Sequence, residues 1–147
     1  DAVAAHFGLP SIRDVAVAVH KGVLGEADLI QLTAVLFAVA ADGDQVARSL
    51  VDRQAAEVAA MAAAAMRQLG MPPAGVPVVL GGGVLESRDP LLLAEIDRQL
   101  AKAAPGATAR LLDVPPIAGA ALLGLDYVGA PTTPKLRLRA CYRAGAR

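Results

Sequence analysis

The chain has 147 residues, enough for one domain with a proper hydrophobic core. Hydrophobic residues make up 55% of it and aromatic residues only 3%, which favours helices packed closely through small side chains. The formal net charge is zero, so a general nucleic-acid surface is not expected. The single cysteine, Cys141, excludes an internal disulfide, gives no metal cluster and fits a reducing cytoplasm. No uncharged apolar run approaches the length that spans a bilayer, so no membrane is expected as a partner.

The first half of the chain predicts three helices. The first begins after Ser11, whose side chain can cap it, with Asp14 three residues on, where a negative charge suits a helix N-terminus. A second helix is predicted over residues 26–41 from the spacing of its leucines. Asp44 caps a long third helix that ends at Gly70. Its larger apolar residues recur in near-helical register: Val46, Leu50, Val58, Met61, Ala65 and Leu69.

The second half changes to an alternation of strand and helix. Residues 76–80 read as a buried strand, and Asp89 followed by Pro90 starts a helix that runs to about Ala103. One face of that helix carries Leu92, Ile96 and Leu100, while Arg98 and Lys102 point to water. Residues 108–112 form a second short strand, so the segment predicts a βαβ unit with two parallel strands.

A small-residue helix over 117–125 and a basic tail complete the chain. Because two parallel strands do not make a stable open sheet alone, we expect further strands upstream of Asp1. Residues 1–126 are interpreted as one structural part and residues 127–147 as a tail. The tail is expected to be mobile, with an alternating edge strand over 135–142 as the alternative.

The glycine turn after the first strand is the most informative motif. Gly81, Gly82 and Gly83 lack Cβ atoms, so a ligand can lie directly against the main chain. They do not form a dinucleotide fingerprint, because Glu86 stands where the third glycine belongs, and they do not form a P-loop. A strand-end turn at the carboxyl edge of a parallel sheet is where α/β proteins bind ligands. A tight turn before a helix explains the same residues, and both interpretations stay open.

The other candidate residues favour structural interpretations. Asp42 and Asp44, on either side of Gly43, are better explained as helix caps than as a cation site. Glu57 and Asp126 are interpreted as solvated. Glu86 and Ser87 are expected in a solvated loop, and small residues at Gly119, Ala120 and Ala121 permit close helix packing. No catalytic triad or metal-ligand spacing can be proposed, so no catalytic or metal-binding residue is assigned.

Three motifs in order resemble the C-terminal part of the BadF/BadG/BcrA/BcrD-type ATPase family. They are the start of the long helix at residues 43–47, the glycine turn at 78–85 and the helix at 115–125. Within this family, the bacterial N-acetylglucosamine kinases look closest, and the family belongs to the actin, Hsp70 and hexokinase superfamily. The resemblance covers roughly residues 1–130.

The resemblance implies an α/β fold: a partial ribonuclease H-like, actin-like ATPase C-terminal lobe, mostly helical with a short parallel βαβ unit. It implies ATP and Mg²⁺ as cofactors, with Gly81, Gly82 and Gly83 as the adenosine motif and Gly119, Ala120 and Ala121 near an interlobe hinge. On this basis residues 1–126 are the C-terminal part of the nucleotide-binding lobe. Mg²⁺, the catalytic base and the amino-sugar substrate would contact mainly residues outside this chain, so these residues alone are expected to be inactive.

Three functions follow as alternatives. The parent protein is an ATP-dependent sugar kinase, expected in the cytoplasm and as a homodimer. Alternatively, it is a superfamily member that uses ATP as a conformational switch or binds without transferring phosphate. The third is a helical domain whose glycine turn is only a turn. The second branch of the family, which uses cysteine-bound iron–sulfur clusters, gains no support from the single Cys141.

Overall fold

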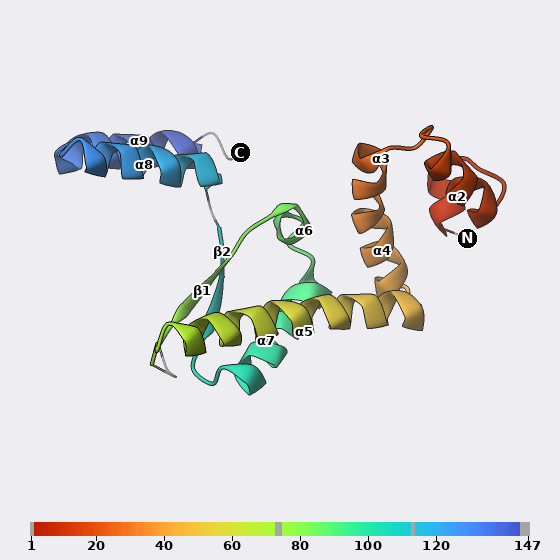
Figure 1. Ribbon diagram of the computed structural model, residues 1–147, viewed down its shortest axis with the longest axis horizontal. Helices are drawn as coiled ribbons and strands as arrows, with labels where there is room; N and C mark the ends of the chain where they lie inside the picture. Colours follow the sequence, from red (N-terminus) through yellow and green to blue (C-terminus); the bar gives the residue numbers. More distant parts are fainter. Residues whose placement is uncertain (1, 73–74, 113, 145–147) are drawn as a thin grey trace. The chain divides into compact units, whose positions relative to one another are not determined.

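The computed structural model describes residues 2–72, 75–112 and 114–144, with the side chains of 143 and 144 left aside, and divides the chain into two compact units, residues 1–110 and 111–147. The described part is mostly helical with a short parallel two-stranded sheet, as expected (Figure 1). The elements in chain order are α1 (Ala2–His6), α2 (Ile12–His20), α3 (Glu26–Ile30), α4 (Leu32–Ala41), α5 (Gln45–Gln68), β1 (Pro77–Leu80), α6 (Gly83–Glu86), α7 (Pro90–Ala103), β2 (Thr108–Leu111), α8 (Pro116–Tyr127) and α9 (Thr132–Ala144).

Side-chain caps start three of the helices at the predicted positions. The Asp14 backbone N–H donates to Ser11 Oγ at 3.3 Å at the start of α2, and the Ala47 N–H donates to Asp44 Oδ1 at 2.8 Å at the start of α5. Asp89 Oδ1 accepts from two backbone N–H groups of α7, each at 3.0 Å. These bonds satisfy donors that have no partner inside the helix, which explains why the helices begin there.

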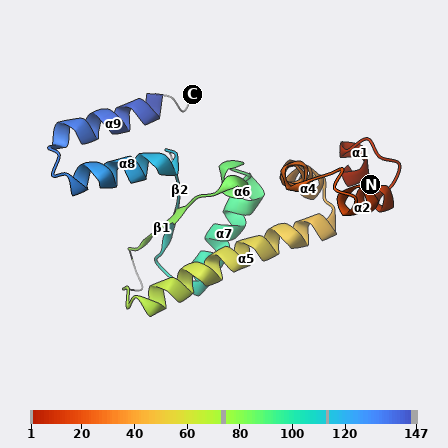
Figure 2. The ribbon, with the colours of Figure 1, turned by 45° about the horizontal axis from the view of Figure 1, so that its top comes forward.

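The helix expected over residues 26–41 is divided into α3 and α4. Gln31 separates them but keeps right-handed helical backbone angles, φ −64° and ψ −23°. Asp42 ends α4 and Asp44 begins α5, which confirms the interpretation of these two carboxylates as caps. The helical segments 26–41 and 45–68 are bent by 116° relative to each other. The bend is visible where α4 meets α5 (Figure 2), and it occurs at Gly43, which takes a φ of +97° that only glycine adopts readily.

The principal core lies between α5 and α7, which run side by side in both views (Figures 1 and 2). On α7 the predicted stripe of Leu92, Ile96 and Leu100 is fully buried. The buried stripe of α5 consists mainly of small side chains: Ala47, Val51, Ala55, Val58, Ala59, Ala63 and Met66. Small residues on one helix therefore receive large residues from the other, as the composition predicts.

Most of the apolar residues that the sequence places in register on α5 do not belong to its buried face. Val46 is 72% exposed, Met61 63% and Leu69 74%, and of the six residues in near-helical register only Val58 is buried. The reason is steric: α7 already supplies the bulky side chains, so the partner surface on α5 must be small. Helical periodicity shows that a helix has an apolar face, but it does not show which face of the helix packs against a neighbouring helix.

The sheet pairs β1 with β2 and is tied to the core at one end. The Thr108 N–H donates to the Val76 carbonyl at 3.0 Å just before β1 begins. A small buried cluster consisting of Ala63, Met66, Val76 and Ala104 joins the end of α5 to the start of β1 and the end of α7. The carboxyl end of β1 then leads into the glycine turn.

The second unit contains α8 and α9, which pack against each other. The predicted edge strand over 135–142 is wrong, because these residues belong to α9. The alternation of Leu136, Arg137, Leu138 and Arg139 looks like a strand, but Leu, Arg and Ala are good helix formers, and packing on α8 buries part of one helical face. The Lys135 ammonium also lies 2.5 Å from Asp126 of α8.

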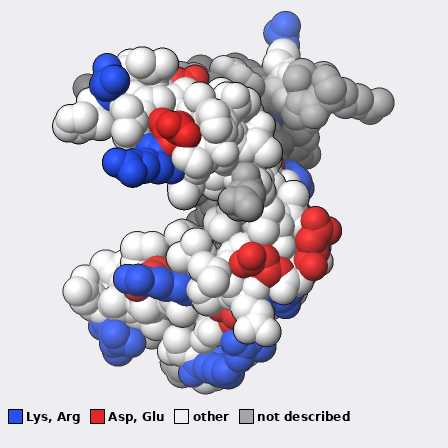
Figure 3. All heavy atoms as spheres, turned by 90° about the vertical axis from the view of Figure 1, so that its right-hand side faces the viewer, with Lys and Arg blue, Asp and Glu red and all other residues white. Residues whose placement is uncertain are grey.

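Uncharged atoms cover most of the face shown in Figure 3, and charged side chains lie there in small separate groups. Several large apolar side chains are exposed, among them Leu123 at 71% and Tyr127 at 93%. Among the described residues, no individual helix combines the length and apolarity needed to cross a membrane; only the bent pair of segments 26–41 and 45–68 passes that test jointly.

Candidate functional site

The glycine turn exposes its main chain at the carboxyl end of β1. All three glycines are exposed, and Gly82 adopts φ +110° and ψ 158°, a conformation that a residue with a Cβ rarely takes. No heavy atom lies within 4 Å of the position that a Cβ would occupy on Gly82 or Gly83. The Gly82 carbonyl accepts hydrogen bonds from the N–H groups of Leu85 and Glu86, so the turn is fixed by the one-turn helix α6. The sequence pattern did not predict α6.

An open cavity of about 540 Å³ begins beside the turn, because Val84, the residue after Gly83, lines it. One wall is apolar and comes from α4 and the first half of α5. The other side carries polar groups of α5. The lining residues include Thr33, Leu36, Phe37, Arg53, Gln54 and Glu57.

The polar groups of this cavity are free to meet a ligand. Within the described residues, Arg53, Gln54 and Glu57 are exposed and make no side-chain hydrogen bond or ion pair. Arg53 can only donate, Glu57 as a carboxylate can only accept, and Gln54 can do both. Glu57 is exposed, in agreement with its interpretation as solvated, but nothing in the local sequence pattern indicates that it lines a cavity together with residues of α4 and α6.

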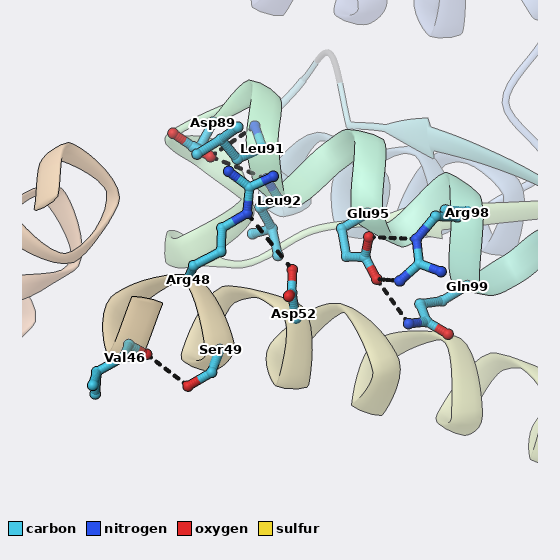
Figure 4. A network of polar contacts seen from close by, with 10 residues as sticks. All are labelled: Val46, Arg48, Ser49, Asp52, Asp89, Leu91, Leu92, Glu95, Arg98 and Gln99. Carbon is cyan, nitrogen blue, oxygen red and sulfur yellow. Dashed lines mark hydrogen bonds and ion pairs between the residues drawn. The ribbon is translucent and has the colours of Figure 1, made fainter. Parts of the chain in front are cut away.

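The polar contacts drawn in Figure 4 lie within α5 and within α7 with its N-terminal cap. Asp89 caps α7, and on α7 the Glu95 carboxylate accepts from Arg98 and, at 2.7 Å, from Gln99. The hydrogen bond from Arg98 lowers the pKa of Glu95, and the same bond raises the pKa of Arg98. The partners of these hydrogen bonds lie on α7 itself or at its N-terminal cap. We therefore interpret them as residues that stabilise this helix rather than as reactive groups.

A second open cavity, of about 530 Å³, lies next to the first. Residues of α1, α3, α4 and α5 line it, and all but Thr33 and Asp44 are apolar. Thr33, Leu36 and Leu50 line both cavities. The two cavities therefore adjoin each other between α4 and α5.

The predicted hinge residues Gly119, Ala120 and Ala121 lie on α8, in a different unit from the glycine turn. Gly119 and Ala120 are exposed, Ala121 is half-buried, and nothing lies within 4 Å of a Cβ built on Gly119. Within the described residues, close packing is therefore not seen at Gly119, and the buried residue of this helix is Ala118. Their role at a hinge stays a prediction.

Among the described residues, no group of His, Cys, Asp and Glu has the arrangement needed to hold a metal ion. Comparison of the chain with protein-family models, with curated proteins and with solved structures finds no match. The function must therefore be argued from the turn, the cavity and the resemblance of the three sequence motifs.

Proposed function

We propose that this chain is the C-terminal portion of the nucleotide-binding lobe of an ATP-dependent sugar kinase, with N-acetylglucosamine as the sugar. The observation that carries the proposal is that the exposed glycine turn is followed directly by Val84, which lines a cavity. A nucleotide needs such a combination, since its ribose and phosphates require close main-chain approach and its base requires a partly apolar slot.

The turn serves as the support for the ribose and α-phosphate of ATP. The open positions at Gly82 and Gly83 leave room for these groups to lie against the backbone. A side chain at Gly82 would occupy that room and strain the backbone, because the φ there is +110°. The family resemblance assigns the same three glycines to adenosine binding.

The cavity receives the adenine base. Its volume of about 540 Å³ lies within the range of small-molecule sites, and its apolar wall suits the faces of a flat aromatic ring. Adenine carries an amino group that donates and ring nitrogens that accept. Glu57 can accept from the amino group, while Arg53 and Gln54 can donate to the ring nitrogens.

Phosphoryl transfer itself is assigned to the whole parent protein. The acidic phosphate loop, the catalytic aspartate and the second phosphate loop of the family have no counterpart in this sequence. The family resemblance implies that Mg²⁺ would be held mainly by residues outside the chain. Transfer depends on positioning and on neutralising charge by metal and donors. The chain alone is therefore expected to lack kinase activity.

The proposal is tested with the parent protein in an ADP-release assay with N-acetylglucosamine. Gly82→Val should raise the apparent Kd for ATP by about tenfold or more, equivalent to about 1.4 kcal/mol. Gly22→Val is the matched control, since Gly22 also has a positive φ of 71° and open space around it but lies outside the glycine turn. Equal loss of stability in both variants with unchanged ATP affinity would show that the turn is only structural.

Two further results separate the alternatives. Tight ATP binding without sugar-dependent ADP release would favour a conformational switch or a regulatory binding protein. Saturable kinase activity from the purified 147-residue chain would overturn the assignment of catalysis to residues outside it.

A further inference from the structure

The helix α8 carries an exposed face without charge. Its members recur at helical spacing along α8 and its C-cap: Ile117, Ala120, Leu123, Gly124, Tyr127 and Val128. Ile117 is 60% exposed, Leu123 71% and Tyr127 93%, whereas Ala118 is buried. Contiguous exposed apolar surface of this kind marks a site at which another molecule or a membrane binds. We call it the apolar face of α8.

The two units of the chain carry opposite net charges. Residues 111–147 contain five Lys and Arg against two Asp, a formal charge of +3, and residues 1–110 therefore carry −3 in a chain whose total is zero. In the described part of α9, Arg137 and Arg139 are exposed, and the Lys135 ammonium lies 2.5 Å from the carboxylate of Asp126. The unit that presents the apolar face is thus the cationic one, which favours an anionic partner.

The ion pair of Asp126 and Lys135 marks one side of a helical hairpin. The helices α8 and α9 lie side by side in both views and are joined by residues 128–131 (Figures 1 and 2). Because a helix turns by about 100° for each residue, Ile117 lies about 180° around α8 from Asp126, and Arg137 lies about 160° around α9 from Lys135. The side away from the ion pair therefore combines apolar residues of α8 with a cation of α9.

This combination fits a lipid surface better than a protein. A second copy of the unit would bring a second charge of +3 against the first, and such like charges repel. On the apolar face the Tyr127 hydroxyl is the one polar side-chain group, so the face has little with which to orient a protein partner. A bilayer needs no such orientation: apolar side chains enter the acyl boundary, tyrosine lies at the interface, and arginines reach lipid phosphates.

We propose that the hairpin of α8 and α9 binds the surface of a bilayer that contains anionic lipids. The apolar face of α8 enters the boundary between headgroups and acyl chains, and Arg137 contacts the phosphates beside it. The expectation against a membrane partner applies to segments that cross the bilayer, and a hairpin on its surface needs none. The inference does not depend on the nucleotide or on the sugar.

Sedimentation with vesicles tests the proposal in the 147-residue chain. The chain should bind vesicles of equal parts phosphatidylcholine and phosphatidylserine more tightly than vesicles of phosphatidylcholine alone. Ile117→Asp should lower the partition coefficient by about tenfold or more, and Arg137→Gln by about fivefold. No binding to the mixed vesicles, or equal binding to both kinds, would overturn the proposal.

The matched control for Ile117→Asp is Ile12→Asp. Ile12 is 58% exposed and begins α2 in the other unit, so the two variants make the same change near a helix N-terminus, where an aspartate is tolerated. Ile12→Asp should leave binding unchanged, and urea titrations should show that both variants stay folded. An equal loss of binding in both variants would show that α8 is not the part that meets the lipid.

Two further measurements locate the contact. With Cys141→Ser as background, a polarity-sensitive dye on Ile117→Cys should shift to the blue when mixed vesicles are added, and the same dye on Ile12→Cys should not. A shift at Ile12→Cys alone would contradict the proposal. Sedimentation velocity without lipid should show a monomer. A dimer that Ile117→Asp dissociates would overturn the proposal and assign the apolar face to a second copy of the chain.

Discussion

Replacement of Ile96 by alanine tests the alanine-lined core most directly. Ile96 is 0% exposed on the face of α7 that packs along α5, where the buried side chains include Ala55 and Ala59. The change removes three carbon atoms, which corresponds to about 2.4 kcal/mol of transfer free energy at ~0.8 kcal/mol for each. The neighbouring alanine side chains cannot extend into the cavity that the substitution leaves, and this cavity costs about 1 kcal/mol more. The free energy of unfolding should therefore fall by about 3–4 kcal/mol in total.

The free energy of unfolding is measured by urea titration with helical circular dichroism as the signal. Ile30→Ala is the control, because Ile30 is 65% exposed in the same unit and its replacement should cost less than about 0.5 kcal/mol. A loss below about 1 kcal/mol for Ile96→Ala, or a loss equal to that of the control, would refute the reasoning that α5 and α7 are rigidly packed at this point.

Three further outcomes are expected. Asp44→Ala removes the cap on Ala47 and should lower the free energy of unfolding by about 1 kcal/mol, whereas Asp44→Asn should retain most of it; equal losses in urea titrations would exclude the cap as the cause. The hydrogen bond from Arg98 lowers the pKa of Glu95 in the folded protein, so the ionised carboxylate stabilises the fold at pH values above the unfolded-state pKa of about 4.3. This contribution to the free energy of unfolding is below about 1 kcal/mol, and it is lost as the pH falls through the pKa of Glu95 in the folded protein. Unfolding titrations across that pH range should therefore show a shallower acid dependence for Glu95→Gln, and identical curves would contradict it. Cys141 is exposed, so a thiol reagent should titrate one equivalent without denaturant; protection until unfolding would show that the thiol is covered.

Local features were predictable because their determinants are neighbours in the sequence. Ser11, Asp44 and Asp89 each accept a backbone hydrogen bond from a residue two or three positions on, and the helices begin where these residues predict. The stripe of α7 was also predictable, since it is the only strongly apolar face of that helix. The glycine turn was located correctly, but its continuation into α6 was not.

Features that depend on contacts between distant segments could not be predicted in the same way. The burial of α5 is decided by α7, so Val46 and Leu50 remain exposed although they lie in helical register. The cavity beside the turn needs α4, α5 and α6 together, so the local sequence around Glu57 does not show that this residue lines it. In α9, alternating leucine and arginine indicated a strand, whereas packing on α8 selects a helix.

The pairing of small residues on α5 with large ones on α7 has a consequence for which positions tolerate mutation. On α5 the smallest side chains, such as Ala55 and Ala59, leave no room for growth, so larger residues there would force the two helices apart. The bulkier Val46 and Met61 on the same helix contribute little to the core and can be exchanged for polar residues at small cost. Substitution scans of this helix should thus find its buried alanines the least replaceable residues and its exposed large apolar residues among the most variable.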